Sequence, residues 1–142
     1  MEVNIDKDLL YQNAISKYKE KTFQLIGAAM EVHKNMGCGF LEAVYEESFR
    51  KELEFMNIPF EEQKSIPIYY KKELLNQYYV ADFVCFGDII VELKAVSELQ
   101  KIHEAQVINY LKATGYEVGL LFNFGASSLQ KKRFFNIYHD TK

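Results

Sequence analysis

The chain has 142 residues, of which 49% are apolar and 26% are charged. These are the values of an ordinary globular domain, so the composition excludes an intrinsically disordered chain. The length suits one domain with a core of two or three layers. The net charge of −3 excludes a strongly basic nucleic-acid-binding protein, although a local basic surface is compatible with it.

The sequence carries no sign of export or of membrane attachment. Its first residues lack the basic start and the apolar run of a signal peptide, and no segment is long enough to span a bilayer. Cys38 and Cys85 lie far apart without the spacing of a zinc site, which favours two reduced thiols. We therefore expect a cytoplasmic protein that makes no contact with a membrane.

The first part of the chain is predicted to be helical. Residues 1–21 are expected to form an N-terminal arm or a short helix ahead of a single domain over residues 22–142. Thr22 is a plausible N-cap for a first long helix, which the glycines near residue 38 end. A second helix with one apolar side is expected from about residue 40 to residue 56.

The middle of the chain changes to the alternation typical of strands. The pattern predicts three strands at about 65–70, 77–86 and 89–95. A helix that ends at a glycine is then expected over about 100–114, and a last buried strand over 118–124. Residues 127–142 fit a helix and a strand equally well. Because the last strand needs the third helix as its crossover, the order predicts an α/β fold with a mixed central sheet flanked by helices.

Two carboxylates and a lysine stand among the apolar residues of two neighbouring predicted strands. Asp82 lies on one strand, and Glu92 and Lys94 lie on the next. Charged groups are rarely buried unless they are paired or bind a metal. The trio suits metal-assisted attack of water on a phosphodiester, in which the carboxylates hold a divalent cation and the lysine steadies water or phosphoryl charge. Taken singly, each residue is better explained as an exposed residue at a strand end than as a catalytic one.

The trio can converge only if the turn between the strands has a particular length. Residues directly opposite each other in an antiparallel pair point to the same face. A two-residue loop at Gly87-Asp88 would place Phe83 opposite Glu92 and leave Asp82 on the other face of the sheet. The functional interpretation therefore predicts an odd-length loop or a bulge, for which Gly87 can supply the positive φ.

Two predicted helices carry further candidates. His103, Gln106 and Tyr110 share one face of the third helix, next to its apolar stripe. That face would cover a cleft, or it would be a boundary face whose polar tips reach water. Glu42 opens the second helix, with Tyr45 one turn later. Glu42 could add a carboxylate to the metal site, or it could only favour the helix dipole.

These residues resemble known motifs. Asp82 followed by Glu92-Leu93-Lys94 resembles the motif of the PD-(D/E)XK nuclease superfamily, with Ala81 where the name expects proline. Residues 106–110 resemble the QxxxY motif of its RecB-type branch. Gly39-x-x-Glu42-x-x-Tyr45 resembles the signature of the small bacterial GxxExxY proteins. The resemblance runs from about residue 22 to residue 133.

The resemblance implies a restriction-endonuclease-like αβββαβ core and a site that binds Mg²⁺ or Mn²⁺. Asp82, Glu92 and Glu42 are the expected metal ligands, and Lys94 is expected to assist the attacking water. The expected catalytic residues are Asp82, Glu92, Lys94, Gln106 and Glu42, and the expected substrate contacts are Tyr110, His103 and Tyr45.

The implied function is a metal-dependent nuclease that hydrolyses phosphodiester bonds of nucleic acid, with DNA favoured over RNA. The protein could also form a homodimer. The alternative is a catalytically silent module that keeps the nuclease fold and binds nucleic acid or protein; the acidic composition and small size are compatible with it. A fold alone does not decide between these functions.

Overall fold

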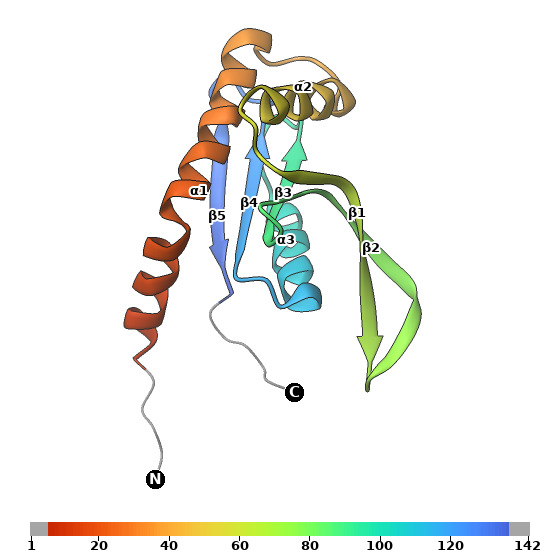
Figure 1. Ribbon diagram of the computed structural model, residues 1–142. Helices are drawn as coiled ribbons and strands as arrows, with labels where there is room; N and C mark the ends of the chain where they lie inside the picture. Colours follow the sequence, from red (N-terminus) through yellow and green to blue (C-terminus); the bar gives the residue numbers. More distant parts are fainter. Residues whose placement is uncertain (1–5, 137–142) are drawn as a thin grey trace.

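The computed structural model describes residues 6–136, which form one mixed sheet with helices on both faces (Figure 1). Its elements are α1 (Lys7–Met36), α2 (Glu42–Phe55), β1 (Phe60–Tyr70), β2 (Glu73–Cys85), β3 (Ile89–Lys94), α3 (Lys101–Thr114), β4 (Val118–Asn123) and β5 (Gln130–Phe135). The strand order is β1-β2-β3-β4-β5, with β3 and β4 parallel and the other pairs antiparallel. The predicted α/β fold is thereby confirmed.

The first helix starts much earlier than predicted. α1 begins at Lys7, after Asp6, whose carboxylate accepts hydrogen bonds from two backbone N–H groups of the first turn at 3.0 and 3.2 Å. Thr22 is buried inside the helix, where its hydroxyl donates to the carbonyl of Tyr18 at 2.9 Å. The predicted N-cap at Thr22 is therefore wrong. The early turns escaped prediction because their buried stripe is built from residues such as Ala14 and Tyr18 rather than from large aliphatic side chains.

The loop between β2 and β3 has the odd length that the functional interpretation required. Cys85 pairs with Ile89 and Phe83 pairs with Val91, which leaves residues 86–88 as a three-residue loop. Two of these three residues have positive φ. Continuing this register places Asp82 and Glu92 on the same face of the sheet.

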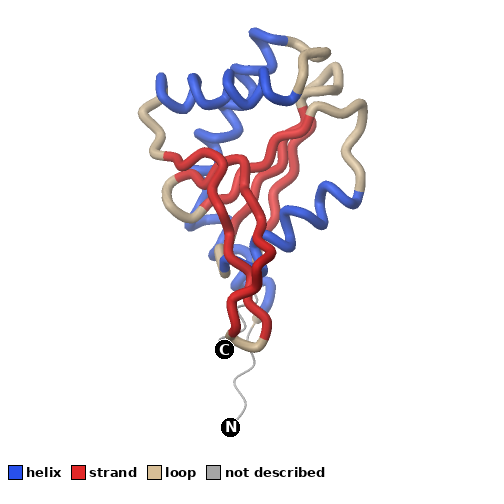
Figure 2. Tube along the Cα trace, turned by 90° about the vertical axis from the view of Figure 1, so that its right-hand side faces the viewer, coloured by secondary structure: helices blue, strands red, loops and turns tan. Residues whose placement is uncertain are grey.

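Helices lie on both sides of the sheet (Figure 2), and the sheet separates two apolar clusters. On one face, buried residues of α1 and α2 pack on alternate residues of β2, β3 and β4, including Phe83, Val91 and Leu120. On the other face, Tyr110 and Leu111 of α3 pack on a smaller cluster from β1, β2 and β3, which includes Val84 and Ile90. Asp82, Glu92 and Lys94 have the parity of Val84 and Ile90, so they belong to the face that α3 covers.

The remaining elements refine the predictions. α3 ends at Gly115 as predicted and returns the chain to β4; it packs so closely on the sheet that a Cβ at Gly119 would lie 2.6 Å from Val107. The undecided tail contains β5, whereas residues 137–142 lie outside the described residues. β1 and β2 are longer than predicted and leave only Lys71 and Lys72 as the turn. Over residues 6–136, no helix combines the length and apolar character needed to cross a membrane.

Candidate active site

Asp82 and Glu92 meet where the backbone pairing of β2 and β3 stops. The paired residues of these strands end at Phe83 and Val91, and side chains then supply the bonds between the strands. The N–H of Asp82 donates to Oε1 of Glu92 at 3.3 Å, and the N–H of Leu93 donates to Oδ2 of Asp82 at 2.8 Å. Each carboxylate thus bonds the backbone of the opposite strand, which fixes both side chains at one point.

The carboxyl group of Glu92 is buried beside a second acid. Glu92 is only 2% exposed. Burial is the main cause that raises its pKa to about 10. The hydrogen bond with the Asp82 side chain and the charge of Asp82 also raise this pKa. The Asp82 N–H and Lys94 lower it by less. A buried carboxylate next to another carboxylate lacks compensating positive charge, and a divalent cation between them would supply it.

Lys94 and Glu42 lie within electrostatic reach of this pair. Lys94 ends β3 and is half-buried. Among the residues that the structure describes, no ion pair includes Lys94. Partial burial and the charge of Asp82 raise the pKa of Glu42, whereas Lys94 and His103 lower it. The first turn of α2 therefore lies within electrostatic reach of Asp82, of the end of β3 and of the first turn of α3.

The described residues do not form a three-carboxylate metal site. Within residues 6–136, no group of three His, Cys, Asp or Glu side chains is arranged to hold a metal ion. The expected ligand set of Asp82, Glu92 and Glu42 therefore stays a prediction, and the contact that the structure describes is the one between Asp82 and Glu92. Mg²⁺ is commonly bound through one or two carboxylates together with water and substrate phosphate, so a two-carboxylate donor set fits this ion.

Comparison with known proteins agrees with this geometry. The model of the PD-(D/E)XK nuclease superfamily matches residues 19–134. The chain belongs to this superfamily. The crystal structure of SSO0001 is similar with a TM-score of 0.53 at 14% identity, over 89% of this chain and 64% of that chain. The chain thus spans less than two thirds of that protein's length, and the likeness shows the fold alone. No curated protein is similar enough to count as a relative.

In this PD-(D/E)XK domain, the α3 residues take different positions. The side chain of Gln106 is half-buried and donates from Nε2 to the hydroxyl of Tyr110 at 3.1 Å. That hydroxyl donates to the carbonyl of Val80 at 3.2 Å, and burial raises the pKa of Tyr110 to about 12. His103 accepts a hydrogen bond at Nδ1 from the N–H of Gln100 at 3.0 Å, so it helps to cap α3. Tyr110 therefore ties α3 to β2, and Gln106 supports the Tyr110 hydroxyl from one helical turn earlier.

Tyr45 is placed in the core of the nuclease-superfamily domain rather than on a substrate-facing surface. It is fully buried and stacks on Phe124 with ring centroids 4.8 Å apart. Its hydroxyl donates to the carbonyl of Gly37 at 2.6 Å and accepts from the N–H of Phe40 at 3.3 Å. These bonds fasten the loop between α1 and α2, which sets the position of Glu42. The expected substrate contact of Tyr45 stays a prediction that its burial does not favour.

Glu46 of α2 lies within reach of the charge of Asp82, and the sequence prediction did not include it among the site residues. Burial, a hydrogen bond with Glu62 and the charge of Asp82 raise its pKa to about 7. Gln63 donates a hydrogen bond to its carboxylate. The sequence spacing could have indicated Glu46, because it follows Glu42 by one helical turn and must share its face of α2.

Asn123 is a second missed residue, and it holds the chain after Lys94. Its side chain is fully buried. Oδ1 accepts hydrogen bonds from the N–H groups of Val96 and Gly125 at 2.9 and 3.0 Å. Nδ2 donates to the carbonyl of Val96 and to Oε1 of Gln130, both at 2.8 Å. Lys94 is the neighbour of Asn123 in the parallel pairing of β3 and β4. This satisfied polar cluster fixes the exit from β3 and hence the backbone that carries Lys94.

Proposed function

We propose that this chain is a metal-dependent nuclease that hydrolyses phosphodiester bonds. The observation that carries the proposal is the buried contact between Asp82 and Glu92, which have Lys94 on the same face of the sheet. Two carboxylates that lie close together without a cation are unfavourable, so the position of Asp82 and Glu92 at one point favours a role in binding a cation. Membership of the PD-(D/E)XK superfamily supports the same chemistry.

Asp82 and Glu92 would hold Mg²⁺ or Mn²⁺. When bound, such an ion polarises a phosphoryl oxygen and favours ionisation of water. Asp82 already bonds the backbone of β3 through one oxygen, which leaves its other oxygen for the ion. Burial of Glu92 excludes bulk water from one side of the site and strengthens electrostatic interactions there.

Lys94 would act on the reacting groups. Its ammonium group can donate hydrogen bonds to the attacking water and to a non-bridging phosphoryl oxygen, on which negative charge accumulates as the water oxygen bonds to phosphorus; the electron pair of the breaking bond goes to the leaving oxygen. Glu42 and Gln106 would border the same cleft from α2 and α3, and His103 would contact the substrate at the start of α3. Tyr110 would act as a positioning residue through Gln106.

The proposal also extends to the subgroup and to the substrate. The residues Gly39, Glu42 and Tyr45 support a place among GxxExxY proteins, and residues 106–110 support the QxxxY branch. DNA is the substrate that we favour over RNA.

A cleavage assay tests the proposed function. Purified protein would be incubated with labelled single-stranded, duplex and structured oligonucleotides of DNA and RNA, in Mg²⁺, in Mn²⁺ and in EDTA. We expect cleavage in the presence of either metal and none in EDTA, and Asp82→Ala should abolish it. Absence of cleavage on every substrate, or equal activity of Asp82→Ala, would contradict the proposal and favour a silent binding module.

A further inference from the structure

The outer parts of β1 and β2 form a two-stranded arm, residues 67–78, that extends away from the helices (Figures 1 and 2). β2 pairs with β3 only through residues 83–85, so the arm has no third strand. Every residue of the arm except Ile68 is exposed. An isolated two-stranded ribbon contributes little to folding, so its length needs a reason outside the core.

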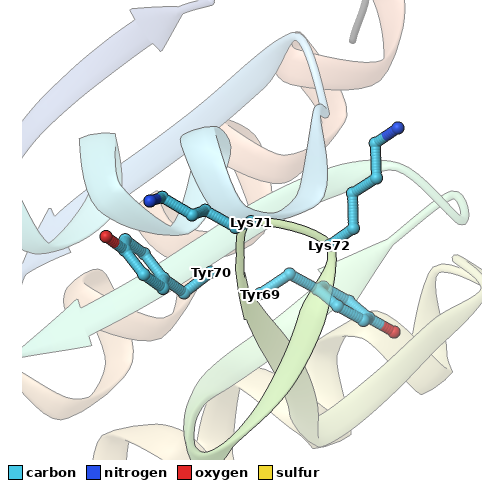
Figure 3. Close-up of a pocket in the computed structure, with 4 residues that line it drawn as sticks. All are labelled: Tyr69, Tyr70, Lys71 and Lys72. Carbon is cyan, nitrogen blue, oxygen red and sulfur yellow. The ribbon is translucent and has the colours of Figure 1, made fainter.

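The tip of the arm presents tyrosines and lysines together. Tyr69 and Tyr70 are 60% and 62% exposed, and Tyr78 is 61% exposed. Figure 3 shows Tyr70 and Lys71 on one side of the turn and Tyr69 and Lys72 on the other. Nζ of Lys71 lies 5.4 Å from the ring centroid of Tyr70. One side of the tip therefore offers an aromatic face with a cation beside it, and the other side carries a further tyrosine and lysine.

The two lysines occupy a turn that suits other residues better. Lys71 and Lys72 both have positive φ, at 47° and 67°. This conformation at both turn positions favours asparagine and glycine, because a Cβ is crowded there. A backbone outlier kept in an exposed turn points to a function for the side chains that it carries.

The charge at the tip favours a polyanion. Within residues 6–136, no ion pair includes Lys71 or Lys72, and Glu73 is the one acid of the arm. Leu74 and Leu75 add apolar surface, which could also suit a second copy of the chain. A symmetric contact between two tips would, however, bring like charges together. Exposed aromatic rings beside cations are the arrangement by which proteins stack and hold unpaired bases.

The arm is continuous with the candidate active site. β2 runs from Glu73, next to the turn, to Asp82 and beyond. Tyr79, at the base of the arm, packs on Tyr110 with ring centroids 4.8 Å apart. A hollow between the arm and α3 is lined by Ile68, Tyr69, Tyr79, Asn109, Lys112 and Ala113. A nucleic-acid strand that binds at the tip can therefore continue over this hollow, where Lys112 adds a positive charge, to the body of the domain.

We infer that the arm binds a single-stranded part of the nucleic-acid substrate, a proposal that rests on the proposed function. Lys72 precedes Asp82 by ten positions, which corresponds to about 33 Å along a strand. At about 3.4 Å per stacked nucleotide, the tip contacts the substrate roughly ten nucleotides from the phosphate at Asp82 and Glu92. A stacked strand of fewer than about ten nucleotides cannot reach both places.

Binding would be measured in EDTA, so that no cleavage occurs, by fluorescence anisotropy with labelled 6- and 20-nucleotide single strands over a series of salt concentrations. The key variant is Lys71→Asn with Lys72→Gly, because these residues suit the turn and keep it folded. Tyr69→Ala with Tyr70→Ala is compared with the corresponding phenylalanine pair. Lys19→Ala with Lys34→Ala, on exposed positions of α1, is the control for charge alone.

We expect the wild type to bind the 20-nucleotide strand at least tenfold more tightly than the 6-nucleotide strand. The turn variant should lower the slope of log affinity against log salt by about 1.4. The alanine pair should weaken binding roughly tenfold or more, and the phenylalanine pair should bind within about twofold of the wild type. Unchanged affinity of the arm variants, or an arm-dependent dimer in sedimentation that binds no strand, would overturn the inference.

The same variants separate this inference from the proposed function. If Mg²⁺-dependent cleavage occurs and the arm variants cleave the 20-nucleotide strand as the wild type does, the arm proposal fails and the nuclease proposal stands. If the arm variants lose binding but the wild type cleaves nothing, the arm proposal stands and the nuclease proposal fails.

Discussion

The N–H of Asp82 donates a hydrogen bond to the carboxylate of Glu92, its neighbour on the next strand, at 3.3 Å. This contact lies where backbone pairing between β2 and β3 has ended. The strands are therefore joined through two acids instead of through their backbones. Such a junction is sensitive to the protonation of Glu92 and to any cation that binds there, and both effects can be measured.

Glu92→Gln should stabilise the metal-free protein at neutral and alkaline pH. Burial raises the pKa of Glu92 to about 10 in the folded state, against about 4.3 in an unfolded chain. Between these values unfolding releases a proton, so the free energy of unfolding falls as pH rises, by up to about 1.4 kcal/mol per pH unit from this group. Glu46, with its pKa raised to about 7, adds to the fall below pH 7. Glutamine removes the contribution of Glu92.

Urea unfolding in EDTA from pH 5 to pH 9 measures this effect. The difference between Glu92→Gln and the wild type should grow with pH over this range. Glu20→Gln, an exposed position of α1, is the matched control and should leave the pH dependence unchanged. A constant difference across the range would contradict the burial argument.

Mg²⁺ or Mn²⁺ should stabilise the wild type against heat. A ligand that binds only the folded state at one hundred times its Kd adds about 2.7 kcal/mol. Because the metal requires both carboxylates to be ionised, the rise in Tm should be larger at pH 8 than at pH 6. Asp82→Asn and Glu92→Gln should each remove it. An equal rise in Tm for these variants would place the metal elsewhere.

The sequence predicted the sheet and the convergence of the trio better than it predicted individual side chains. The loop over residues 86–88 followed from the requirement that Asp82 and Glu92 share a face, and the structure has it. The start of α1 could not be predicted, because its buried stripe includes Ala14, Tyr18 and Thr22, which do not form the pattern of large aliphatic residues that marks a helix face in a sequence. Spacing also cannot say whether a tyrosine hydroxyl meets a substrate or a carbonyl, and Tyr45 meets the carbonyl of Gly37.

Tyr45→Phe should lower stability without removing activity. The substitution leaves the carbonyl of Gly37 and the N–H of Phe40 without their partner, which should cost about 1–3 kcal/mol. Urea unfolding gives the cost, and cleavage per folded molecule should remain close to that of the wild type. Tyr11→Phe, an exposed position, should change neither. Loss of cleavage without loss of stability would restore Tyr45 to the substrate-binding surface.

Asn123→Ala should destabilise the protein and impair the site through its backbone. It removes four hydrogen bonds of a fully buried side chain, so we expect a loss of about 2–4 kcal/mol. The exit of β3 should loosen, and amide hydrogen exchange should rise at Val96 more than in β1. Protection of Val96 equal to that of the wild type would contradict the positioning role of Asn123.

Lys94→Ala gives the most direct test of the central claim, when metal binding and cleavage are measured on the same protein. Mn²⁺ binding would be followed by electron paramagnetic resonance and cleavage under single-turnover conditions. Lys94→Ala should still bind Mn²⁺ and should lose cleavage about a hundredfold or more, whereas Asp82→Ala should lose both. Wild-type cleavage by Lys94→Ala, or wild-type Mn²⁺ binding by Asp82→Ala, would contradict a nuclease site built on Asp82, Glu92 and Lys94.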